Sequence, residues 1–298
     1  MSGMFAVGRH EMLSALRDRL PRTLLIVFLG MIAASSLIGW LTNQTVTAVY
    51  NQLLTDGLTK APNPFTGVSP LRYMSNTVIY IILIGALLAT VAGVQASLRD
   101  RKTNTADLVL SRPVSTIGYL TGKLLGQGVW LAMILSISAV TNWISISAIT
   151  GTVLSATQAA QIALFYSTGW VFLMGFLSIG MISGLRSRTE ATALLGPILF
   201  WAVLVFVVPQ LGTAAHPVSL LNPVASPPSQ GGFFQLMNAA LGPLAIGEHF
   251  KTASSFVLGM NSSDASPGLS FAVIVLFAVT TIAALLATPR TVLRSTLT

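Results

Sequence analysis

Residues 124–185 read LLGQGVWLAMILSISAVTNWISISAITGTVLSATQAAQIALFYSTGWVFLMGFLSIGMISGL, and these 62 positions contain no Asp, Glu, Lys or Arg. A helix needs about 20 mostly apolar residues to cross the roughly 30 Å hydrocarbon layer of a bilayer. The stretch is therefore long enough for two membrane-spanning helices with a turn at Thr150–Thr152. We expect these two spans near 124–149 and 158–184.

The composition of the whole chain supports the same conclusion. Charged residues make up 8% of the 298 residues, and hydrophobic residues make up 53%. Soluble domains carry a charge on about a quarter of their residues, so a chain with this composition must be surrounded largely by lipid. The absence of cysteine excludes a disulfide framework, a thiolate metal site and a cysteine nucleophile. The sequence thus predicts an integral membrane protein.

Four further apolar stretches without charge are long enough to cross the bilayer. They lie near residues 23–41, 76–96, 191–211 and 269–288. The predicted fold class is therefore all-α, a polytopic membrane protein with six transmembrane helices. We divide the chain into an N-terminal elbow helix over 1–22 and a six-helix transmembrane domain over 23–298.

Lys and Arg are concentrated in alternate segments between the spans, as expected when positive residues stay in the cytoplasm. With the N-terminus inside, the inner set is Arg9, Arg17, Arg19, Arg22, Arg99, Arg101, Lys102, Arg112, Lys123, Arg186, Arg188, Arg290 and Arg294. The outer set is Lys60, Arg72 and Lys251. With the acids counted, the inner face carries the whole net charge of +8. We therefore expect a multi-pass protein of the inner (plasma) membrane with both termini cytoplasmic, and no nucleic-acid partner.

The leader before the first span has the pattern of an amphipathic helix that lies in the membrane interface. Its apolar face consists of Phe5, Met12, Leu13, Leu16 and Leu20. Glu11 and Asp18 lie on the opposite face. The leader is either a membrane-surface anchor or an elbow helix that also touches a cytoplasmic partner.

The two outer segments, 43–75 and 212–268, are rich in Pro, Gly, Ser and Asn and show no regular pattern, so we expect loops or short helices there. An apolar patch over 233–246 is compatible with a short helix that dips into the outer leaflet. Two small-residue spacings, Gly122-xxx-Gly126 and Gly180-xxx-Gly184, let helices approach closely and indicate helix packing.

No motif in the chain indicates a catalytic, metal or nucleotide site. No titratable residue lies in the central part of any predicted span, which argues against a proton-driven antiporter or a voltage-gated channel. The three histidines lack the close spacing of metal ligands. GYLTGKL over 118–124 has three residues between its glycines and Leu after Lys, whereas a phosphate-binding loop needs four and then Ser or Thr. We expect no enzyme activity and no cofactor in this chain.

The segment between the second and third predicted spans reads RDRKTNTADLVLSRPVSTIGYLTGK over 99–123. Asn104 with Asp107 predicts the start of a helix. Arg112-Pro113 ends that helix because the residue before proline avoids helical geometry. Ser115 can cap the next helix, which continues into the third span. We predict a short, charged cytoplasmic coupling helix joined closely to a membrane helix.

Three stretches carry a resemblance to a family. LVLSRPVSTIGYLTGKLLGQ over 108–127 resembles the L-L-L-S-x-P-V-S-R…GK signature between the second and third spans of type 2 ABC exporter permeases, the ABC-2 family. RHEMLSALRDR over 9–19 is similar to the K-E-x-x-x-x-x-R-x-R leader of these permeases, and LLNPVA over 220–225 is similar to a segment outside their fifth span. The chain departs from the family pattern at Lys102, Asn104 and Thr116.

The resemblance implies the membrane half of an ABC exporter, which pairs with a second permease copy and with cytoplasmic ABC ATPase subunits that bind ATP and Mg. It implies that spans two and five line the route, and that the leader and the segment after span two dock on the ATPase. The implied coupling residues, none of them catalytic, are Arg9, Glu11, Arg17, Arg19, Arg101, Asp107, Arg112 and Pro113.

The uncharged interior of the spans favours an apolar or amphipathic cargo, because a bare ion would lack compensating charges there. Conformational work on an outer partner remains open beside export. The alternative from another class is a stand-alone channel or secondary transporter.

Overall fold

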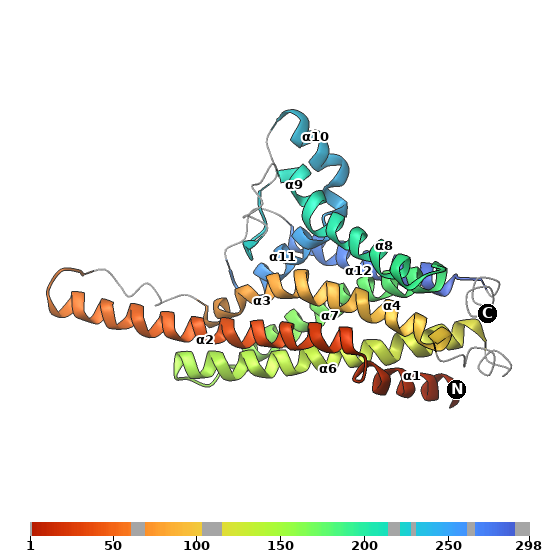
Figure 1. Ribbon diagram of the computed structural model, residues 1–298. Helices are drawn as coiled ribbons and strands as arrows, with labels where there is room; N and C mark the ends of the chain where they lie inside the picture. The colour runs from red at the N-terminus through yellow and green to blue at the C-terminus, as the bar shows by residue number, and fades with distance from the viewer. Residues whose placement is uncertain are drawn as a thin grey trace.

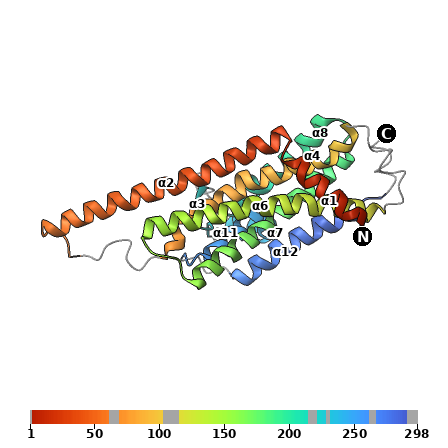
Figure 2. The ribbon, with the colours of Figure 1, turned by 90° about the horizontal axis from the view of Figure 1, so that it is seen from below.

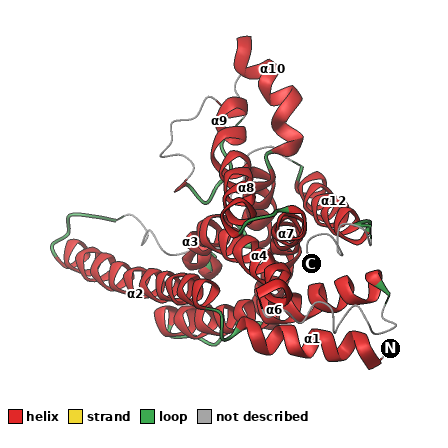
Figure 3. Cartoon of the chain, turned by 45° about the vertical axis from the view of Figure 1, so that its right-hand side comes forward, coloured by secondary structure: helices red, strands yellow, loops and turns green. Residues whose placement is uncertain are grey.

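The structure is a computed structural model that describes residues 2–60, 69–102, 115–213, 221–227, 231–260 and 266–289. These residues form helices and no strand (Figure 3). Six helical segments are long and apolar enough to cross a membrane, and each overlaps one predicted span, so the all-α polytopic class is confirmed. They are Arg19–Thr55, Pro70–Arg99, Thr116–Thr150, Ala156–Arg186, Glu190–Leu211 and Pro267–Leu286. The predicted coupling helix falls in 103–114, outside the described residues.

The fourth span, α7 (Ala156–Arg186), lies at the centre of the bundle and packs against α4 (Ala86–Lys102) of the second span (Figure 1). Glycines make this contact close, because a Cβ atom at Gly180 would overlap the backbone of Thr90, and one at Gly184 would overlap Ser97. The prediction that Gly180-xxx-Gly184 serves helix packing is therefore confirmed.

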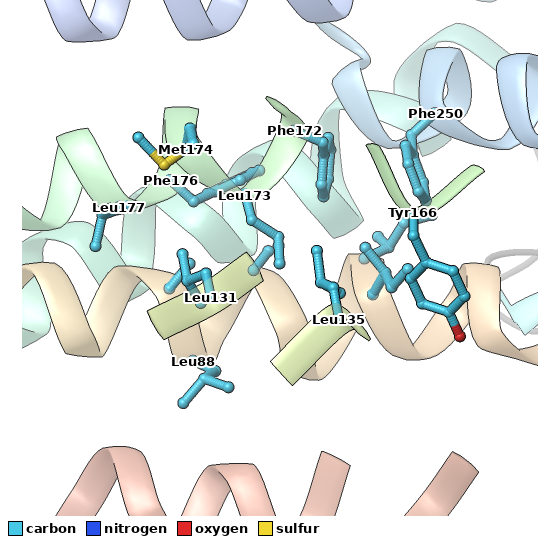
Figure 4. Packing of buried hydrophobic residues seen from close by; sticks show 14 of the residues in the cluster. Leu88, Leu131, Leu135, Tyr166, Phe172, Leu173, Met174, Phe176, Leu177 and Phe250 are labelled. Atoms are coloured by element: carbon cyan, nitrogen blue, oxygen red, sulfur yellow. The ribbon is translucent and has the colours of Figure 1, made fainter. Parts of the chain in front are cut away.

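Aromatic side chains continue the core from α7 to the outer helix α11 (Ile246–Val257). The ring of Phe172 stacks on the ring of Phe250 with centroids 4.7 Å apart, and Phe176 meets Phe172 edge to face at 5.1 Å (Figure 4). Phe176 also meets Phe277 of α12 (Pro267–Leu286). These rings therefore connect α11, which is too short to cross a membrane, to α7 and α12, which are long enough.

The second and fifth spans contain turns of π-helix. The second consists of η1 (Pro70–Met74), α3 (Ser75–Tyr80), the π turn η2 (Ile81–Gly85) and α4. The fifth consists of α8 (Glu190–Ala202), the π turn η3 (Val203–Val207) and α9 (Val208–Thr213). Both turns widen the helix and free backbone groups, as π turns often do near functional sites.

The leader differs from the single helix expected over 1–22. Helix α1 (Ser2–Ala15) ends first, Asp18 is extended, and α2 (Arg19–Thr55) starts anew. Pro21 accounts for the break, because proline lacks an N–H and is tolerated only in the first turn of a helix. The chain therefore turns at Leu16–Asp18 and places α1 against the side of the bundle (Figure 2).

The expectation of a loop or short helices from Asn43 onward was wrong for the first part of that segment. Helix α2 continues to Thr55 and projects beyond the other helices (Figures 1 and 2). No Gly or Pro interrupts residues 42–56, and the helix ends where Gly57 takes a positive φ of 69°. The hydroxyl of Tyr73 donates to Asn43 Oδ1 at 3.0 Å and holds this part of α2 to the second span.

The outer segment after the fifth span contains α10 (Gly232–Leu241), the short turn η5 (Gly242–Leu244) and α11. The short helix expected over 233–246 is confirmed in α10. Helix α11 also lies in the segment 212–268, where loops or short helices were expected, although no pattern gave its bounds. Lys251 Nζ donates to Glu248 Oε1 at 2.8 Å, and this pairing lets both enter the protein.

Candidate coupling site

Four charged side chains from four parts of the chain meet near the end of the bundle that holds the N-terminus. Glu11 comes from α1, Asp18 from the turn before α2, Arg99 from α4, and Lys123 from α6 (Thr116–Thr150). Arg99 pairs with Glu11 through one guanidinium nitrogen and with Asp18 at 2.6 Å through the other. We call these four residues the ion cluster.

Glycines bring α1 close enough to α6 for the ion cluster to form. A Cβ atom at Gly126 would overlap Gly8 O and Glu11 Cβ, and one at Gly122 would press on Met4 O. The prediction that Gly122-xxx-Gly126 serves helix packing is confirmed, and the partner of this spacing is the leader helix.

Glu11 is the centre of the ion cluster and is only 1% exposed. Its carboxylate accepts hydrogen bonds from both Arg99 and Lys123. The amide of Gln127 adds contacts at 3.4 Å to the carboxylate and to the carbonyl of Glu11. Each of these partners donates, so the carboxylate and the backbone carbonyl of Glu11 both act as acceptors.

Lys123 is as deeply buried as Glu11, at 1% exposure. Its ammonium donates to Ala96 O of α4 at 2.8 Å as well as to Glu11. Lys123 therefore joins three helices: α1, α4 and α6. Helix α6 begins as expected, since the hydroxyl of Ser115 accepts from Gly118 N at 3.0 Å.

The two carboxylates and two cations of the ion cluster balance in charge. Burying an ion costs several kcal/mol unless a partner and further hydrogen bonds compensate it. A neutral, well-bonded cluster meets that condition, whereas loss of one member would leave a charge without its compensation. The arrangement holds α1, α4 and α6 in one fixed relation.

The predicted coupling residues fall into four groups in the structure. Arg9, Arg17 and Arg19 are exposed. Glu11 is buried, whereas Leu13 and Leu16 of the apolar face are exposed, which agrees with its expected place opposite that face. The backbone of Arg101 lies in α4. The remaining three, Asp107, Arg112 and Pro113, lie outside the described residues.

Sequence reasoning missed Asp18, Arg99, Lys123 and Gln127 as members of the site, because the charged ones looked like ordinary positive-inside or leader residues. One signal was available. Lys123 stands between the two glycines of the Gly122-xxx-Gly126 spacing, and a lysine in a close helix contact needs a buried partner.

The ion cluster joins helices through charged side chains. Within the described ranges, no group of three or more His, Asp and Glu side chains could hold a metal ion. The contacts of Glu11 are ion pairs and hydrogen bonds between helices.

Six potential spans and a leader helix fastened by buried ion pairs to the second and third of them define a polytopic membrane protein. The family model described as ABC-2 family transporter protein matches residues 5–292, which is nearly the whole chain. The chain belongs to this family of ABC-2 transporter proteins and is a transmembrane component of an ABC transporter. No curated protein matches it.

Proposed function

We propose that this chain is the transmembrane subunit of an ATP-driven exporter in which separate cytoplasmic ATPase subunits bind ATP and Mg and hydrolyse the ATP. Membership of the ABC-2 family supports the transporter class. The observation that carries the coupling is the buried ion cluster, which fastens the leader helix to spans two and three. The end of the bundle that holds the cluster faces the cytoplasm in this proposal.

The coupling surface consists of the exposed leader arginines Arg9, Arg17 and Arg19 together with the inner segment between spans two and three. Within that segment the proposal assigns Arg101, Asp107, Arg112 and Pro113 to contact with the ATPase. Glu11 acts by position: a force applied to α1 is passed on to α4 and α6, because the three helices share its ion pairs.

The cargo in this proposal is apolar or amphipathic, or the subunit performs conformational work on an outer partner. A second copy of the chain completes the membrane unit. Spans two and five line the route, and the π turns η2 and η3 in these two spans support that assignment. The indole N–H of Trp201 donates to Ile82 O at 3.4 Å and links the two spans at one of these turns.

The test begins with purification of the native complex from its own membrane. A nucleotide-binding protein present in equal amounts supports the proposal. The triple variant Arg9→Glu, Arg17→Glu, Arg19→Glu should lose that protein, because exposed charges at an interface govern association. The matched control is Arg72→Glu, an exposed arginine of η1 in the outer set, which should retain it.

Reconstitution separates the exporter from the alternative class. The permease alone in liposomes should move no solute, and the complete complex should do so only with ATP. Solute movement by the permease alone, without ATP, would identify a channel or secondary transporter and end the proposal.

A further inference from the structure

A cavity of about 440 Å³ lies between α9, α10, α11 and the start of α12, away from the N-terminus (Figure 1). Its size falls in the range of about 300–1,000 Å³ that is typical of small-molecule sites. Val208, Leu269 and Val273 form apolar walls, and Ala239 of α10 lies among the lining residues. Leu269 is exposed at the edge of the cavity, so an apolar molecule can reach it from the surrounding lipid.

Several polar groups in the wall are already committed to bonds within the chain. His249 uses both ring nitrogens, Nδ1 with Ser270 Oγ at 3.1 Å and Nε2 with Gly242 O at 3.2 Å. The hydroxyl of Thr252 donates to Glu248 O at 3.1 Å. The hydroxyl of Ser266 accepts from Leu269 N at the start of α12.

The carboxylate of Glu248 retains capacity for a ligand. Its Oε1 accepts from Lys251 Nζ at 2.8 Å and its Oε2 accepts from Ser226 N at 3.0 Å. Each carboxylate oxygen has two acceptor positions, so both oxygens can accept once more. The Glu248 side chain is 14% exposed and that of Lys251 only 3%, so the group within reach of a ligand is the acceptor and not the ammonium.

We infer that this cavity binds an amphipathic primary amine, with its apolar chain along Val208, Leu269 and Val273 and its ammonium on Glu248. An ammonium donates charge-assisted hydrogen bonds, which are stronger than bonds between neutral groups. A fatty acid is disfavoured because its carboxylate would meet the carboxylate of Glu248. Binding requires no ATPase subunit, so the inference is independent of the proposed function.

The test uses the full chain in detergent and two photoactivatable probes with the same twelve-carbon chain and a diazirine in mid-chain. One probe carries a primary amine and the other a carboxylic acid. The amine should label peptides of α11 and the start of α12, with about a tenfold preference over the acid, as one charge-assisted hydrogen bond supplies. Unlabelled dodecylamine should compete.

Filling the cavity provides the matched comparison. Val273→Trp should abolish the labelling, whereas Val275→Trp, on the exposed side of the same helix, should leave it unchanged. Ala239→Trp should also abolish it, and this variant is safe for the fold because α10 buries none of its residues. Ala240→Trp, the exposed neighbour that does not line the cavity, is its control.

Labelling that survives both filling variants would overturn the inference, as would labelling spread evenly over the exposed faces of the spans. Equal labelling by the acid would overturn the assignment of the head group to Glu248. Co-purification of an ATPase would be unaffected by any of these results, so failure of the site and failure of the exporter proposal are distinguishable.

Discussion

At the scale of single residues, burial gives Glu11 a role that its sequence position did not suggest. A carboxylate in a leader helix next to arginines looks like part of a charged surface. In the structure it is 1% exposed and is held by donors from α4 and α6. Loss of this carboxylate would remove a contact that two buried or half-buried cations, Arg99 and Lys123, share.

Replacement of Glu11 by Gln should lower the free energy of unfolding by about 3–5 kcal/mol, because it replaces the buried carboxylate that both Arg99 and Lys123 contact with a neutral amide. Thermal unfolding of the purified chain in detergent measures this. The control Arg9→Gln alters an exposed residue of the same helix and should change stability by no more than about 0.5 kcal/mol. The double change Glu11→Gln with Lys123→Met should recover part of the loss. No recovery would show that the pair is not the cause.

His249 makes the stability of the outer helices depend on pH. Burial lowers the pKa of His249 below its ordinary value of 6.5, although the Gly242 carbonyl and Glu248 oppose the shift. The folded chain thus prefers neutral His249, with Nε2–H donating to Gly242 O and Nδ1 accepting from Ser270. The stability that neutral His249 contributes to the fold is fully present above pH 6.5 and is lost as the pH falls through the lowered pKa.

Melting temperatures measured from about pH 8 down to about pH 5 should therefore fall more steeply for the wild type than for His249→Gln. The glutamine can still donate to Gly242 O but does not titrate. Parallel curves for the two proteins would contradict the assignment.

At the scale of helices, glycine contacts decide where the leader lies. Helix α1 meets α6 with backbone close to backbone at Gly8, Gly122 and Gly126. Close backbone contacts at glycines also join α4 to α7. Close helix approach of this type is the usual consequence of small-residue spacings in membrane proteins.

Gly126→Ala should displace α1 and destabilise the chain by about 1–3 kcal/mol, because the added methyl group overlaps Gly8 O and Glu11 Cβ. Gly30→Ala is the matched control. It lies inside α2, and nothing within 4 Å would meet its methyl group. That change should be neutral or stabilising by up to about 1 kcal/mol, from helix propensity. Equal stability of the two variants would refute the close docking of α1.

At the scale of the whole molecule, the six spans could be predicted because the length of a charge-free stretch and the thickness of a bilayer are both simple quantities. The ion cluster could not, because it joins residues as far apart as Glu11 and Lys123, 112 positions along the chain. Such a pairing depends on the turn before Pro21, which folds α1 back on α6. The bounds of helix α11 could not be predicted for a related reason, since Glu248 and Lys251 neutralise each other only after folding.

The orientation of the molecule is testable because the natural chain contains no cysteine. A membrane-impermeant maleimide added to intact cells should label Asn51→Cys, in the projecting part of α2, and should leave Arg17→Cys unlabelled until the cells are opened. Both side chains are exposed, so access across the membrane decides the result. Labelling of Arg17→Cys in intact cells would invert the topology and remove the basis for an ATPase at that end.

The length of α2 has a mechanical consequence. Its 37 residues form a rod of about 55 Å, nearly twice the thickness of the hydrocarbon layer. A pivot of about 10° at its Arg19 end would swing the Thr55 end by about 10 Å. A small rotation at one end of this helix thus becomes a wide sweep at the other.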